Sequence, residues 1–376
     1  MGSGLLHPRV PIEKTSPLFR AVLRLPHFAA ARRLMEEVFA RFRDGDGNFI
    51  REFQTGGFSP RVFELALFAY LEEGGYELDR SRAIQDFLIC EPHPVAIEAT
   101  TTNPAQNTGT DTAPPVETLS ALTHEYPAEA REFVFQAAKA LRRKLLKRDS
   151  LGLAYWELPN IVGIPFVIAV EAFHNTESLS HTVSPLIEYL YGRRDQPMFE
   201  ADGTLRLAAQ AIREHRHAGR RIPSGLFALD EAIPLAAVLF SNTGTVSKFN
   251  RIGTELGYGP PDVTLIRYGF VADPDPNAIV PRRFAYIVSE CDPDDRERFA
   301  EGLDLVHNPN AEVQIPAGAL RNLTEHQLRH DGLVLTTGPT PPILTSKTLN
   351  FRGSGAAMLA RKQLAELRRA GFEELW

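Results

Sequence analysis

The chain has 376 residues, 43% of them hydrophobic and 23% charged, which is typical of a soluble globular protein with one elaborated domain or two average ones. Its net charge of −6 lacks the basic excess of a nucleic-acid binder, so any such binding must come from local patches. No apolar run approaches the roughly 20 residues of a membrane helix, and the N-terminus shows no signal peptide. Two cysteines, Cys90 and Cys291, exclude a disulfide framework and a zinc knuckle. The sequence therefore predicts a cytoplasmic protein without membrane contact.

Three local basic patches are present, at residues 142–148, 215–221 and 361–369. A solvated helix face explains each patch taken singly at least as well as nucleic-acid binding does. The patches are therefore candidates and no more.

The first 50 residues contain two short basic amphipathic stretches, 18–25 and 29–42. They are followed by the Asp- and Gly-rich residues 44–48, which lack the Glu that a calcium loop carries at its twelfth position. We expect a turn there, at the end of an N-terminal extension covering residues 1–50.

A helix is predicted to begin at Ser59 and Pro60, a helix-capping residue followed by a proline suited to the first turn. The pair Gly74-Gly75 should end this helix. Two strands follow, at 84–90 and 94–100, and then a polar, turn-rich segment at 103–115 that is long enough to be functional or disordered.

A second long helix is predicted at about 128–147, and the apolar run 164–170 reads as a strand buried on both faces. Strand, helix and buried strand in this order are typical of a parallel crossover unit. The apolar run 235–240 either extends the same sheet or begins another one.

From about residue 260 the pattern changes to short strands, such as 263–271 and 283–288, and the chain ends in an amphipathic helix at 356–370. We therefore expect an α/β core at 51–260, with a mixed sheet flanked by helices. A strand-rich C-terminal region at 261–376 should follow it.

One acidic residue of the first long helix stands out. On a helical wheel Glu64 falls inside the apolar arc made by Phe63, Leu67, Leu71 and Phe68. A carboxylate facing a core is costly unless it is paired or binds a metal. A buried Glu bonded to an arginine or to backbone explains this position as well as a functional site does.

Two more carboxylates, Asp86 and Glu98, interrupt the two neighbouring apolar strands. Strand alternation places Glu98 on one face with Ala96 and Thr100. Adjacent antiparallel strands can bring both carboxylates within reach of one hard cation such as Mg²⁺. Two acids in neighbouring apolar strands are less easily explained as structural than one would be.

A lysine of the second long helix also breaks the pattern. Lys144 falls inside the apolar arc of that helix, whereas Arg142 and Arg143 point outward and Lys147 lies at the polar edge. Its stem could follow apolar surface while its ammonium stays in water. The same helix should cover the sheet that carries the two acids, however, so we expect the amine within reach of them.

The order helix-Glu, strand-Asp, strand-Glu, helix, strand resembles the PD-(D/E)xK, or restriction-endonuclease-like, superfamily over about residues 60–175. The chain is also similar, over about residues 50–350, to a poorly characterised group of bacterial proteins that shares several short strings. Those strings correspond here to Gln85-Asp86-Phe87, residues 98–104, Lys144-Leu145 with residues 155–159, residues 248–251 and residues 307–311. The resemblance implies a nuclease in which Glu64, Asp86 and Glu98 bind Mg²⁺ or Mn²⁺.

Two departures from the superfamily pattern matter. Gln85 replaces the proline of the motif, which leaves the acid in place, and Thr100 replaces its lysine. Thr100 cannot supply the cation that orients water or offsets charge on the phosphate. In divergent members of the superfamily this cation moves to the following helix, which makes Lys144 the candidate replacement and leaves Thr100 a hydrogen-bonding group at the edge of the site.

The sequence thus predicts a metal-dependent nuclease that cleaves phosphodiester bonds, with DNA as the expected substrate and bacterial defence as a possible setting. The alternative is a catalytically inactive protein of the same fold that binds nucleic acid or serves as an assembly subunit. A homo-oligomer or a partner in a defence complex remains open in both cases.

The loop at 241–245 could bind an anion through its amides, but a plain strand-to-helix turn is the simpler explanation. Lys248 and Arg251 follow it and could contact a nucleic-acid backbone or form structural salt bridges.

Overall fold

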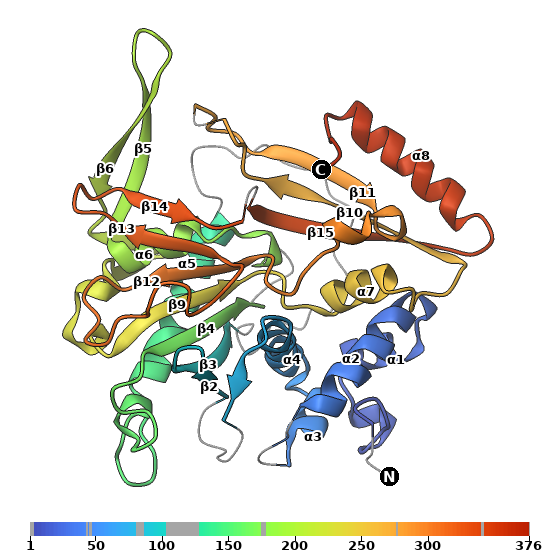
Figure 1. The fold of residues 1–376 in the computed structure, drawn as a ribbon, viewed down its shortest axis with the longest axis horizontal. Coiled ribbons are helices and arrows are strands. Elements are labelled where there is room, and N and C mark those ends of the chain that lie inside the picture. Colours follow the sequence, from blue (N-terminus) through green and yellow to red (C-terminus); the bar gives the residue numbers. More distant parts are fainter. Residues whose placement is uncertain are drawn as a thin grey trace.

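The computed structural model describes residues 4–42, 44, 47–79, 86–102, 128–173, 178–275, 277–339 and 342–375. An eight-stranded mixed sheet with helices on both faces dominates the molecule (Figure 1). This confirms the expected α/β class with a mixed sheet flanked by helices. The strands lie in the order β1 (Glu77–Leu78), β2 (Phe87–Glu91), β3 (Val95–Thr102), β4 (Phe166–Ala172), β9 (Leu235–Ser241), β12 (Leu303–His307), β13 (Thr324–Leu328) and β14 (Val334–Thr337).

The centre of the sheet follows the predicted order. Strands β2 and β3 are antiparallel neighbours, and β3, β4 and β9 run parallel to one another. Helix α5 (Ala128–Leu145) connects β3 to β4 and packs on both. The predictions of an antiparallel strand pair in this part of the chain, of 164–170 in the same sheet and of a parallel crossover are therefore confirmed. The first strand begins only at Phe87, and residues 84 and 85 of the predicted strand lie outside the described residues. The run 235–240 extends this sheet as β9.

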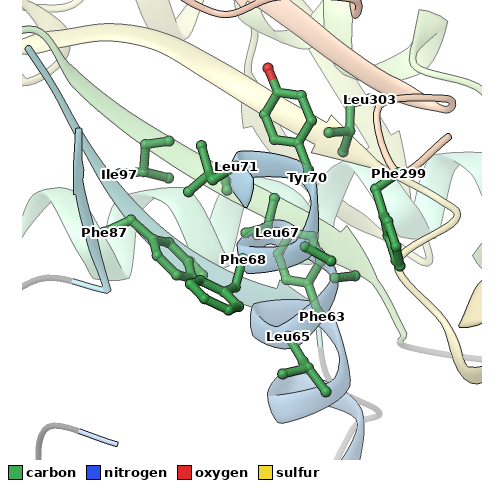
Figure 2. Close-up of a cluster of buried hydrophobic side chains, with 14 of the residues drawn as sticks. Phe63, Leu65, Leu67, Phe68, Tyr70, Leu71, Phe87, Ile97, Phe299 and Leu303 are labelled. Carbon is green, nitrogen blue, oxygen red and sulfur yellow. The ribbon is translucent and has the colours of Figure 1, made fainter. Parts of the chain in front are cut away.

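The two faces of the sheet are covered by different helices because the strand residues alternate. Val95, Ile97 and Ala99 pack into the core on the side of α4 (Phe58–Glu73), whereas Ala96 packs into the core on the side of α5. Figure 2 shows side chains of α4 meeting Phe87 and Ile97. All residues of β3, β4 and β9 are buried, as expected for strands covered on both faces.

Helix α4 begins two residues earlier than the sequence predicted, since Ser59 was expected as its N-cap and Pro60 as its first residue. Its N-cap is Gly57, and Ser59 lies within the first turn, because a tight turn through Thr55 joins the preceding α3 (Phe49–Gln54) directly to α4. The expected end at the glycine pair is confirmed, since the helix stops at Glu73.

The N-terminal helices belong to the same core as α4. Helices α1 (Pro17–Arg24) and α2 (Ala29–Arg41) form where the two amphipathic stretches were predicted. Their buried residues Phe19, Val22 and Met35 pack in the cluster that contains α4. At 44–48, Asp44 accepts bonds from the amides of Gly47 and Phe49, as in a turn.

The C-terminal part of the chain contributes to two sheets. Strands β12, β13 and β14 join the large sheet, which therefore crosses the expected boundary at residue 260. A separate three-stranded sheet of β11 (Arg282–Ile287), β10 (Val263–Val271) and β15 (Ile343–Arg352) packs against α8 (Ala356–Arg369). Helix α7 (Val246–Glu255) lies beside α2 (Figure 1).

Two antiparallel ribbons connect α6 (Ser184–Tyr191) to β9. The longer ribbon, β5 (Arg193–Phe199) with β6 (Leu205–Ala211), projects from the body of the molecule, and the shorter one is β7 (Glu214–His217) with β8 (Arg220–Pro223) (Figure 1). Short 3-10 helices lie at Ile12–Lys14, Pro26–Phe28, Tyr155–Glu157, Ser178–Ser180, Leu226–Ala228, Asp230–Ala232, Val288–Glu290 and Pro293–Asp295.

In the ranges described above, no helix is both long and apolar enough to cross a bilayer. The turn-rich segment predicted at 103–115 lies outside the described residues.

Candidate functional site

Asp86 and Glu98 lie close together where β2 begins. Phe87 of β2 is opposite Ile97 of β3, so the antiparallel register, continued by one residue, brings Asp86, just before β2, beside Glu98. The Oδ2 atom of Asp86 accepts a hydrogen bond from the Ala99 amide at 2.7 Å, which fixes the carboxylate against the backbone of β3. The Glu98 side chain points to the face that α5 covers, where it meets Lys144.

Lys144, in the last turn of α5, reaches these acids. Its Nζ lies 2.5 Å from Oε1 of Glu98, and the two side chains are 15% and 5% exposed. The expectation that this amine lies within direct reach of the acids is confirmed. A lysine in the apolar arc of a helix is stabilised here by a buried carboxylate across the helix–sheet interface.

Two other cations of the same helix end also point into the site. Arg143 donates from its guanidinium to Oγ1 of Thr100 at 2.9 Å, and the Lys147 amine lies 2.5 Å from the Tyr155 hydroxyl. Both side chains are exposed, as predicted, but each also makes a contact toward the site that was not predicted. Such long side chains can keep contact with water while their polar ends reach the strand and loop beneath the helix end. Arg142 also faces solvent, where it pairs with Glu231.

Glu64 lies at the border of this cluster and already has a partner. Its Oε2 is 2.5 Å from the guanidinium of Arg61, which also pairs with Glu52, and the Glu64 side chain is 14% exposed. Burial raises the pKa of Glu64, the Arg61 charge opposes that rise, and the charges of Lys144 and Glu98 act on it as well. Both explanations drawn from the sequence thus have support: Glu64 is bonded to an arginine, and it is electrically part of the acid cluster.

Burial and like charge disfavour the ionised form of Asp86 in this cluster. Burial raises the pKa of Asp86 well above its ordinary range, and repulsion from Glu98 and Glu64 raises it further. The Oε2 atom of Glu98 is buried, and none of the described residues donates a hydrogen bond to it. A hard divalent cation beside these groups would bind the free oxygen of Glu98 and would stabilise the ionised form of Asp86.

Tyr155 is a member of the site that the sequence did not identify. Burial raises the pKa of its hydroxyl, and the negative charge of Glu98 raises it further. Its ring lies under the Lys147 amine, 4.9 Å from centroid to nitrogen. Its place in a shared string, shortly after Lys144, was the available signal, but the string alone did not indicate contact with Glu98.

Over the described ranges, no group of three or more His, Cys, Asp or Glu side chains has a geometry that could hold a metal ion. The oxygen ligands that the site offers are therefore the neighbouring pair Asp86 and Glu98, with Glu64 held by Arg61.

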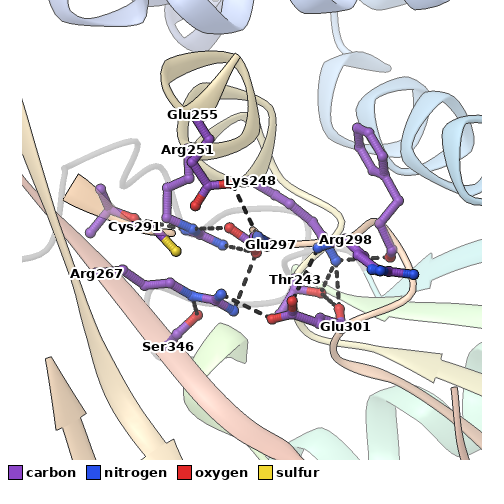
Figure 3. Close-up of polar contacts among 12 residues, drawn as sticks. Thr243, Lys248, Arg251, Glu255, Arg267, Cys291, Glu297, Arg298, Glu301 and Ser346 are labelled. Atoms are coloured by element: carbon purple, nitrogen blue, oxygen red, sulfur yellow. Dashed lines mark hydrogen bonds and ion pairs between the residues drawn. The ribbon is translucent and has the colours of Figure 1, made fainter. Parts of the chain in front are cut away.

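Lys248 and Arg251 are not surface cations. They are 1% and 2% exposed and lie in a buried polar network, so the suggestion that they contact a nucleic-acid backbone is wrong (Figure 3). Arg251 makes a two-bond pair with Glu297 at 2.6 and 2.7 Å. Lys248 donates to the carbonyl oxygens of Phe299 and Glu301 at 2.9 and 2.5 Å.

The loop at 241–245 is a strand-to-helix turn whose amide is satisfied from within the chain. Both carboxylate oxygens of Glu171 lie 3.2 Å from the Gly244 nitrogen, and Ser241 Oγ also accepts from it. In the string at 307–311, buried Asn308 donates to the carbonyl oxygens of Ala232 and Leu235. Both segments therefore have structural roles.

A cleft of about 570 Å³ lies elsewhere in the molecule and is lined neither by Asp86 nor by Glu98. Residues of α2, α4 and α7 and of the segment around Arg296 line it. None of the sequence-predicted site residues borders this cleft.

No protein-family model, curated protein or solved structure matches this chain. The functional interpretation therefore rests on the residues and the geometry described above.

Proposed function

We propose that the chain is a metal-dependent nuclease that hydrolyses phosphodiester bonds of DNA on a restriction-endonuclease-like core. One observation carries the proposal. The ammonium of Lys144 lies 2.5 Å from Oε1 of Glu98, and Glu98 is the neighbour of Asp86 across the β2–β3 pair. Asp86 and Glu98 supply the two negative charges that this reaction needs, and Lys144 of α5 supplies the positive one. The lysine of the superfamily motif is replaced by Thr100 in this chain.

Asp86 and Glu98 would hold Mg²⁺ or Mn²⁺. They fit such an ion because Glu98 has an unsatisfied buried oxygen and Asp86 has a raised pKa that a nearby cation would lower. When bound, the divalent cation supplies Lewis acidity at the scissile phosphate and promotes ionisation of the attacking water. Glu64 would contribute negative charge at the rim while Arg61 holds its carboxylate.

The cations of the α5 end would act on the phosphate. Lys144 is placed to stabilise the charge that develops on the phosphate oxygens, and its contact with Glu98 keeps it oriented before substrate binds. Arg143 brings a guanidinium to Thr100, the position where the motif has its lysine. Lys144 and Arg143 together would replace the missing motif lysine.

A second candidate function keeps the fold without the chemistry. Glu98 is only 4% exposed, Lys144 already neutralises it, and Arg61 engages Glu64. In an inactive nucleic-acid-binding or assembly subunit, for example of a defence complex, these contacts would serve stability alone.

A nuclease assay on single-stranded DNA, double-stranded DNA and RNA, with Mg²⁺, with Mn²⁺ and with a chelator, tests the proposal. The wild type should cleave DNA only with metal, and Asp86→Asn and Glu98→Gln should each lose about a hundredfold or more in rate. Lys362→Ala, which removes an exposed cation of the distant helix α8, is the control and should keep full turnover. Equal cleavage by Asp86→Asn and the wild type would refute the assignment, and a wild type that binds DNA without cleaving it would favour the second candidate.

A further inference from the structure

Two of the three basic patches of the sequence come together in the fold. Strand β7, from the patch at 215–221, packs along α5, which carries the patch at 142–148, and the rings of His217 and Phe135 are 5.9 Å apart. Residues 128–148 and 213–221 hold eleven of the 41 Lys and Arg of the chain but only three of its 47 Asp and Glu. A chain with a net charge of −6 thus gathers positive charge on one surface, which we call the α5–β7 surface.

The basic side chains of α5 on this surface form a regular stripe. Arg131, Phe135, Lys139 and Arg143 recur every four residues, so each lies one turn from the next in a row that winds about 40° per step around the helix. Lys147 continues this row beyond the helix end. Phe135 contacts β7, and the four cations are exposed around it. The stripe runs from the ribbon to Arg143 and Lys147, the residues that reach Thr100 and Tyr155 in the site.

Two arginines repel each other in the β7–β8 ribbon. Its register puts Arg216 directly opposite Arg221. Like charges directly opposite each other destabilise a ribbon. Arg216 has a partner in Glu214. Of the described side chains, none forms an ion pair with Arg220 or Arg221. A bound polyanion would offset this repulsion.

We infer that the α5–β7 surface binds the sugar–phosphate backbone of a DNA duplex and directs it to the Lys144–Glu98 site. The inference rests on the proposed function, since it identifies the bound polymer with the substrate of that site. The stripe from Phe135 to Arg143 is about 12 Å long at 1.5 Å per residue, and a four-residue ribbon adds at most about 13 Å. Together these span no more than about seven base pairs at about 3.4 Å each.

The side chains favour a duplex over a single strand. Binding of unpaired strands relies on exposed aromatic rings on which bases stack. On the α5–β7 surface Phe133 is buried and Phe135 is half-buried against His217, and the described residues there include no exposed aromatic side chain. Exposed guanidinium and ammonium groups suit phosphates instead.

The test is binding to a DNA duplex of about 20 base pairs, measured by fluorescence anisotropy in EDTA at several salt concentrations. The variant is Arg220→Ala/Arg221→Ala, and the matched control is Lys362→Ala/Arg369→Ala, which removes two exposed cations from α8. We expect the variant to bind about tenfold or more weakly at low salt. The slope of log K against log salt should fall by about two, because each phosphate contact contributes about 0.9.

The outcomes separate this inference from the proposed function. Unchanged affinity and slope in the variant, an equal loss in the control, or tighter binding of single-stranded DNA or of RNA than of the DNA duplex would each overturn the inference. Hydrolysis of the small substrate bis(p-nitrophenyl) phosphate with Mn²⁺ does not need the surface, so variant and wild type should hydrolyse it equally. A wild type that leaves this substrate and DNA intact but shows the slope change would refute the proposed function while supporting the surface.

Discussion

The carboxyl group of Glu171 should make the stability of the fold depend on pH. It is fully buried in β4, where it accepts a hydrogen bond from the Gly244 amide. Burial raises its pKa from 4.5 to about 7, against opposing contributions from Ser241, Gly244 and Lys248. The folded protein therefore favours the neutral acid, whereas the unfolded chain ionises near pH 4.5. Glu171 consequently contributes stability that is complete below about pH 4.5 and is lost as the pH rises through about 7.

The substitution Glu171→Gln keeps the shape and removes the ionisation. The rise of the Glu171 pKa from 4.5 to about 7 corresponds to about 3 kcal/mol of folding stability, at about 1.4 kcal/mol per pKa unit. The wild type should lose about 2 kcal/mol of this stability between pH 5 and pH 7.5. Relative to the wild type, the variant should gain that amount in free energy of unfolding over this range. The upper pH stays below the value of about 8 to which burial lowers the pKa of Lys248.

Equilibrium urea unfolding at pH 5 and pH 7.5, followed by tryptophan fluorescence, measures the effect. The exposed substitution Glu312→Gln is the control and should follow the wild type at both pH values. If the free energies of unfolding of the wild type and of Glu171→Gln change by the same amount between the two pH values, Glu171 is not a neutral acid in the folded protein.

Three further substitutions test the buried interactions. Glu297→Gln should cost about 3 to 5 kcal/mol in urea unfolding, because it leaves two buried guanidinium groups short of a carboxylate. Gly269→Ala should lower the melting temperature strongly, since a Cβ there would lie 2.0 Å from the backbone oxygen of Thr345. Glu98→Gln alone should destabilise by a similar few kcal/mol by leaving Lys144 without its anion, and Glu98→Gln/Lys144→Met should recover part of that loss in the same measurement. Equal stability of the single and double variants would show that the pair is not coupled.

Local patterns in the sequence predicted the centre of the site. Strand alternation and the short hairpin predicted that Asp86 and Glu98 are neighbours, and the helical wheel placed Lys144 against the sheet that carries Glu98. These predictions succeed because period-two and 3.6-residue patterns report burial directly. The continuous apolar strands β4 and β9 were recognisable for the same reason.

Contacts between distant segments could not be predicted in this way. The wheel correctly placed Arg143 on the exposed side of the helix, but it could not predict that the guanidinium also reaches Thr100. Lys248 and Arg251 look like surface cations in sequence, and only the partners that come from residues 297–301 explain their burial. Likewise, the pairing of β12 with β9 joins segments more than 60 residues apart, and no local pattern encodes it.

The central claim is that Asp86 and Glu98 bind a divalent cation, and the melting temperature measured against Mn²⁺ concentration tests it most directly. An ion that binds only the folded state adds about 2.7 kcal/mol of stability at a hundred times its dissociation constant. The wild type should therefore show a rising melting temperature, and Glu98→Gln/Lys144→Met, which lacks the ligand but retains a neutral, packed site, should show none. A melting temperature that rises equally in both proteins, or in neither, would contradict the claim.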